Sequence, residues 1–88
     1  MEGQFRDVSD LARQAIAQLR ATDPRNVRAS RRGLCAAVVI EKRTFIFRRC
    51  TDGLVRLEAW TNRNGNAKVT TYRLPNALER EAGELLDR

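Results

Sequence analysis

The sequence contains no histidine and only two cysteines, Cys35 and Cys50. A structural zinc site with the usual four nitrogen or sulfur ligands therefore cannot be assembled from one chain. The absence of histidine also excludes nucleophilic catalysis by Ser-His-Asp or Cys-His arrangements. A glycine-rich phosphate loop is missing as well, because Gly33, Gly53 and Gly65 each stand in a predicted turn. We therefore predict a protein that is not an enzyme and that uses no metal or cofactor.

Long apolar stretches are also missing. No run approaches the ~20 residues that a membrane span needs, and residues 1–6 lack the basic-then-apolar order of a signal peptide. Two cysteines are too few for a disulfide scaffold. We expect a cytoplasmic protein with reduced thiols and no membrane association. Residues 1–88 are enough for one small domain, since domains typically run about 100–150 residues.

Lysine is scarce, because 15 of the 17 basic residues are arginine. The net charge of +6 is concentrated in residues 25–73, where 12 basic residues face three acidic ones, a net charge of +9. Residues 1–24 and 74–88 carry −1 and −2. Arginine makes bidentate contacts to phosphate or carboxylate that lysine cannot match, so this pattern favours an anionic partner. A GC-rich coding sequence, which favours arginine and alanine, is an alternative source of the arginine excess.

The hydrophobic pattern predicts two helices around a sheet. Apolar residues at helical spacing, ended by Pro24, predict a helix over 8–21, and a second helix is predicted over 75–88. Residues 22–33 are expected to be a basic connecting loop. Four strands are predicted, at 34–40, 44–50, 54–62 and 67–74. The expected fold class is α+β: a single domain in the order α-β-β-β-β-α, with a four-stranded antiparallel meander and both helices on one face.

The turns predict the register of the sheet, because side chains alternate between its two faces. Turns at Glu41-Lys42, 51–53 and Asn64-Gly65 bring the larger apolar side chains to one face. We expect this face to pack under the helices; it comprises Leu34, Ala36, Val38, Ile40, Phe45, Phe47, Val55, Leu57, Ala59, Tyr72 and Leu74. The opposite face is predicted to carry the rows Cys35–Arg48–Arg56–Arg73, Ala37–Ile46–Glu58–Thr71 and Val39–Thr44–Trp60–Val69.

Three adjacent arginines repel one another unless they spread into solvent or hold an anion. Clustered arginines bind phosphates, and an exposed tryptophan stacks on an unpaired base. We therefore predict that the arginine-rich sheet face and the basic loop bind DNA or RNA, with Glu58 acting as a counter-ion of the arginines. The candidate binding residues are Arg48, Arg56, Arg73, Arg28, Arg31, Arg32 and Trp60.

The same pattern allows an alternative function. The chain could be a protein-binding inhibitor or adaptor, of phage or plasmid type, that docks on an acidic partner surface. We also expect a homodimer, because the row that contains Trp60 would otherwise leave an apolar patch in water.

The order of a helix, an antiparallel meander and a final helix is similar to that of the double-stranded-RNA-binding domain. That family places a lysine cluster at the start of its last helix, whereas residues 75–81 are acidic here, and this chain has an additional strand. We therefore transfer none of the family's RNA contacts to this chain.

Overall fold

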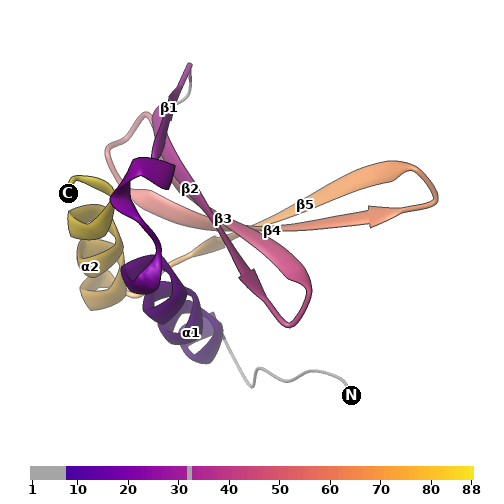
Figure 1. Cartoon of the computed structure of the whole chain (residues 1–88), viewed down its shortest axis with the longest axis horizontal. Coiled ribbons are helices and arrows are strands. Elements are labelled where there is room, and N and C mark those ends of the chain that lie inside the picture. Colours follow the sequence, from indigo (N-terminus) through magenta and orange to yellow (C-terminus); the bar gives the residue numbers. More distant parts are fainter. Residues whose placement is uncertain (1–7, 32) are drawn as a thin grey trace.

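The structure is a computed structural model that describes residues 8–31 and 33–88, with the side chains of Ser30 and Arg63 excepted. Its elements are α1 (Val8–Ala21), the 3-10 helix η1 (Pro24–Asn26), β1 (Arg28–Ser30), β2 (Gly33–Ile40), β3 (Arg43–Arg49), β4 (Val55–Arg63), β5 (Asn66–Arg73) and α2 (Asn76–Leu86). The five strands form one antiparallel sheet in chain order, and both helices pack on the same face of it (Figure 1). The predicted α+β class and helix placement are confirmed, but the meander has five strands where we predicted four.

The additional strand, β1, lies within residues 22–33, which we predicted to be a loop. The Asp23 carboxylate accepts a hydrogen bond from a backbone N–H of η1 at 2.9 Å, and Pro24 supplies the fixed φ of its first turn. Val27 then packs against the core, which brings the backbone of β1 beside β2. Pairing there satisfies backbone groups along the edge of β2. The prediction of a loop was wrong because three residues are too few to show strand periodicity.

The core lies between the helices and the face of the sheet that we predicted to be buried. Phe45 and Phe47 are fully buried, and Leu57 lies opposite Phe47 in the register. Leu34 and Tyr72 of the predicted core face are only partly buried. α1 contributes five buried residues at helical spacing: Leu11, Ala12, Ala15, Ile16 and Leu19. The predicted core face is therefore confirmed, and the helices leave the opposite face of the sheet uncovered (Figure 1).

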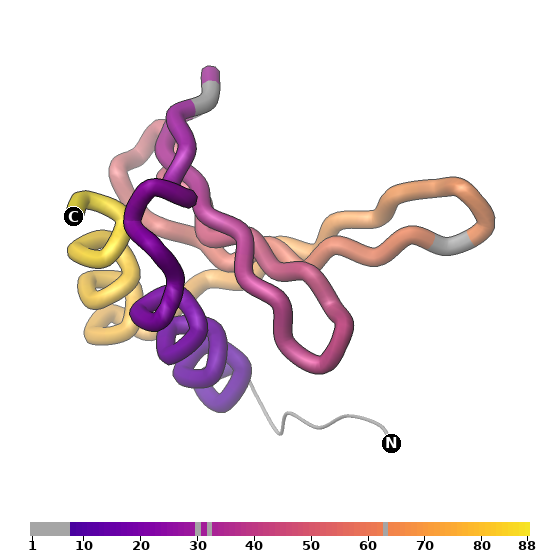
Figure 2. Tube along the Cα trace, in the orientation of Figure 1, coloured from indigo at the N-terminus to yellow at the C-terminus, as the bar shows by residue number. Residues whose placement is uncertain are grey.

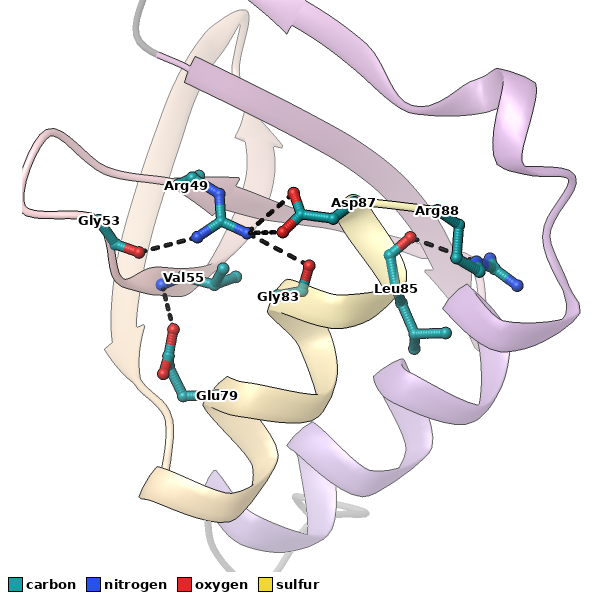
Figure 3. Close-up of polar contacts among 8 residues, drawn as sticks. All are labelled: Arg49, Gly53, Val55, Glu79, Gly83, Leu85, Asp87 and Arg88. Atoms are coloured by element: carbon teal, nitrogen blue, oxygen red, sulfur yellow. Dashed lines mark hydrogen bonds and ion pairs between the residues drawn. The ribbon is translucent and has the colours of Figure 1, made fainter.

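Polar contacts fix α2 against the sheet (Figure 3). The Arg49 Nη2 donates to the backbone carbonyl of Gly83 at 3.2 Å and to the carboxylate of Asp87 at 3.1 Å. A guanidinium at this position complements the negative end of the helix dipole. Near the other end of α2, the Glu79 carboxylate accepts the first N–H of β4 at 2.9 Å. These contacts hold α2 in place against the core face of the sheet.

The β4–β5 hairpin projects beyond the helices (Figures 1 and 2). Its Asn64-Gly65 turn has positive φ at both residues, 56° and 79°, as the predicted two-residue turn requires. Residues 64–71 are exposed. The hairpin therefore carries two solvent-facing surfaces at this end of the molecule.

Candidate functional site

The candidate site is the face of the sheet opposite the helices, which we call the outer face. Paired residues of neighbouring strands point to the same side, so the register places Cys35, Arg48, Arg56 and Arg73 in one line across β2–β5. This row was predicted and is confirmed. Arg28, which we placed in a loop, pairs with Cys35 and extends the row onto β1. We call the five residues the arginine row.

Arg48 is not free to spread into solvent. Its Nε donates to Glu58 Oε2 at 3.0 Å, and the Nε1 of Trp60 donates to the other oxygen of the same carboxylate at 3.2 Å. Glu58 is 7% exposed, and the side chain of Arg48 is 13% exposed. A carboxylate this deeply buried requires charged or polar donors, which Arg48 and Trp60 supply. Glu58 thus acts as a counter-ion, as predicted, and connects the arginine row to Trp60.

Arg56 also has a carboxylate partner. Its Nη2 donates to Asp52 Oδ2 at 3.0 Å, from the turn between β3 and β4. The Asp52 side chain also accepts the backbone N–H of Leu54 at 3.0 Å. The hydrogen bond from Leu54, followed by the positive charge of Arg56, lowers the pKa of Asp52 below its ordinary value of 3.8. Asp52 is therefore ionised at neutral pH and offsets the charge of Arg56.

The arginines at the two ends of the arginine row differ from Arg48 and Arg56 in their exposure. Arg28 and Arg73 are both exposed, and Arg31 is exposed in the turn after β1. Within residues 8–31 and 33–88, no ion pair involves any of these three side chains. Arg32, also a predicted site residue, lies outside the described residues. Of the predicted site arginines, Arg28, Arg31 and Arg73 are thus the ones that no carboxylate of the described residues neutralises.

Trp60 borders a hollow of about 640 Å³ on the outer face, which we call the Trp60 hollow. Its lining includes Lys42, Arg43, Thr44, Ile46, Trp60 and Asn62. Trp60 and Ile46 supply apolar surface, Thr44 and Asn62 supply hydrogen-bonding groups, and Lys42 supplies a cation. The guanidinium of Arg43 instead lies over the ring of Phe45, 5.3 Å from its centroid, on the core face. No carboxylate is among the described residues that line the hollow.

Two valines extend the apolar surface beside Trp60. Val69 pairs with Trp60 across β4 and β5 and is 41% exposed, and Val39, opposite Thr44, is 59% exposed. The predicted row Val39–Thr44–Trp60–Val69 is therefore confirmed as a row, and its valines face solvent.

Sequence reasoning missed Lys42 and Asn62 as members of the site. Lys42 belongs to the tight turn between β2 and β3, where φ is positive at both Glu41 and Lys42, 50° and 68°. The turn was predicted, so the signal was available: it carries the cation Lys42 next to β3, the strand that pairs with Trp60.

The described residues contain no group of three or more histidine, cysteine, aspartate or glutamate side chains that could hold a metal ion. Cys35 and Cys50 are both free thiols. None of the described helices is long and apolar enough to cross a membrane.

No protein-family model, curated protein or solved structure matches this chain.

Proposed function

We propose that the outer face binds nucleic acid without catalysing a reaction on it. The observation that carries this proposal is an uncovered sheet face that carries Arg28, Arg73 and the partly exposed Trp60, with Arg31 in the adjoining turn. None of these three arginines has a carboxylate partner among the described residues. Arginine binds phosphate oxygens through its planar guanidinium, and aromatic rings bind bases. Such a function fits a cytoplasmic protein.

The internal carboxylates divide the predicted binding residues into two groups. Arg28, Arg31 and Arg73 can contact phosphate directly. Arg48 and Arg56 already hold Glu58 and Asp52, so a phosphate would have to compete with a carboxylate for them. We therefore assign the main phosphate contacts to the first group.

The proposal is tested by measuring oligonucleotide affinity at several salt concentrations. Affinity is expected to fall steeply with salt, because each phosphate contact releases counterions. Arg28→Ala and Arg73→Ala should each lower the slope of log affinity against log salt by about one unit. Arg80→Ala is the matched control, since Arg80 is exposed on α2, on the other side of the sheet.

Two results would overturn the proposal. One is the absence of binding to any oligonucleotide at low salt. The other is a loss of affinity in Arg80→Ala equal to that in Arg73→Ala, because binding would then follow the net charge of the protein and not the outer face.

The exposed valines favour a second candidate function, docking on an acidic protein surface. Val39 and Val69 provide apolar contact area that phosphates do not use, and aromatic residues such as Trp60 dominate protein interfaces. In that case Trp60→Ala would weaken complex formation more than Arg73→Ala does, and no oligonucleotide would be bound at low salt.

A further inference from the structure

The chemistry of the Trp60 hollow points to one form of nucleic acid. Resting on the proposed function, we infer that the ligand is single-stranded and that one unpaired base stacks on Trp60 inside the hollow. The proposed function combines phosphate contacts with an aromatic ring that binds bases, and it leaves the form of the nucleic acid open.

The hydrogen bond of Trp60 determines which part of the indole a ligand can use. Its Nε1–H already donates to Glu58 at 3.2 Å, and the same carboxylate is held by Arg48. The polar group of the indole is thus satisfied inside the protein, and the ring is fixed along β4. The surface that remains for a ligand is the aromatic ring itself, which suits stacking and not hydrogen bonding.

The other side chains of the hollow match the remaining parts of a nucleotide. Ile46 adds apolar surface next to the ring, and Thr44 and Asn62 offer donors and acceptors for the polar edge of a base. Lys42 adds a cation for a neighbouring phosphate. An apolar plane with polar edges and a negatively charged backbone is the composition of a nucleotide in a single strand.

A duplex does not present a base in this way. Its bases are paired and stacked on one another, so a protein reaches only their edges through the grooves. Access to a ring face requires the base to leave the stack, which costs a few kcal/mol in a duplex and little in a single strand. Trp60 lies four residues from Arg56 along β4, about 13 Å at the usual rise of a strand, so the hollow and the arginine row can contact one extended chain.

The test compares a single-stranded oligonucleotide with a duplex of the same sequence. Trp60 is the only tryptophan, so its fluorescence reports directly on the hollow. The single strand is expected to quench this fluorescence and to bind more tightly than the duplex. Trp60→Ala should weaken single-strand binding about 5- to 140-fold, the range that stacking of one base contributes. Trp60→Phe should retain most of the affinity, because it keeps an aromatic ring.

The controls separate stacking from loss of structure. Val39→Ala removes exposed apolar surface in the same row but outside the hollow, and it should leave affinity unchanged. Circular dichroism checks that Trp60→Ala retains the fold. If it does not, the affinity of Trp60→Phe for the single strand is the measurement that tests stacking. The slope against salt should be the same in all three variants, since none of them removes a charge.

Failure of this inference and failure of the proposed function give different results. If the duplex binds as tightly as the single strand and the fluorescence of Trp60 does not change, the inference is wrong, while a steep salt dependence would still support nucleic-acid binding. If neither form binds at low salt, both are wrong, and the protein-docking function takes their place.

Discussion

Arg48 and Arg73 stand in the same row of the sheet, yet only Arg48 has a buried carboxylate against it. The difference arises because Glu58 lies one row further along β4, where its side chain reaches Arg48 and Trp60 together. At the scale of single residues, the function of an arginine here depends on whether an internal anion reaches it. Arg48 therefore has a structural role in the outer face, whereas Arg73 is exposed and can contact a ligand.

This difference predicts different stability effects for two substitutions in one row. Arg48→Ala should lower the free energy of unfolding by about 3 kcal/mol, because Glu58 would keep a buried charge without its guanidinium partner. Arg73→Ala should change it by less than about 0.5 kcal/mol, as expected for an exposed position. Urea denaturation measures both. Equal effects would contradict the role that we assign to the Arg48–Glu58 pair, and Glu58→Gln in the Arg48→Ala background should recover part of the loss.

At the scale of elements, the edge of the sheet formed by β1 depends on a close approach between the backbones of Gly33 and Arg49. Gly33 pairs with Ser30 at the end of β1 and has a φ of 115°. A Cβ at this position would lie 2.4 Å from the backbone oxygen of Arg49, on the neighbouring strand β3. The chain therefore requires glycine here for two reasons, the positive φ and the absence of space.

Gly53 provides a matched control for the effect of this contact. Its φ is also positive, 86°, but a Cβ there would meet no atom within 4 Å. Gly53→Ala should cost about 1–2 kcal/mol from backbone strain alone. Gly33→Ala should cost at least about 1 kcal/mol more, because the backbone of β2 or β3 must move. Urea denaturation of both variants checks this. Equal losses of unfolding free energy would mean that the contact with Arg49 does not affect stability.

At the scale of the whole molecule, the outer face has one apolar region that two different partners could cover. The homodimer that we predicted from the sequence would bury the row Val39–Thr44–Trp60–Val69, and a nucleic-acid strand would occupy the Trp60 hollow. Both would use the same surface. We therefore expect dimer formation and nucleic-acid binding to compete.

The competition is measured by light scattering. At high protein concentration without ligand, the mass should approach twice the 10.0 kDa of one chain. Added single-stranded oligonucleotide should then convert the dimer into complexes that contain one protein chain. A mass near 10.0 kDa at all concentrations would rule out the dimer, and a dimer that persists at saturating oligonucleotide would place the two interfaces on different surfaces.

The two helices, the four long strands, their register and the core face could all be predicted from the amino acids alone. These features follow from local rules: hydrophobic periodicity sets each element, and the length of each turn sets which residues face one another. A turn such as Asn64-Gly65 thus places Trp60 opposite Val69 without any knowledge of the rest of the molecule. The four members of the arginine row on β2–β5 were predictable for the same reason, whereas Arg28 on β1 was not.

What the outer face offers to a ligand depends on tertiary contacts that the sequence does not reveal. β1 forms because an edge of β2 and a core contact for Val27 are available, and neither is visible in three residues of sequence. The register places Glu58 near several arginines, but which guanidinium it holds depends on side-chain geometry and burial. The Trp60 hollow likewise requires a turn and three strands to meet in space. Rows are fixed by the backbone, whereas ion pairs and hollows depend on how side chains from distant positions fill the space between them.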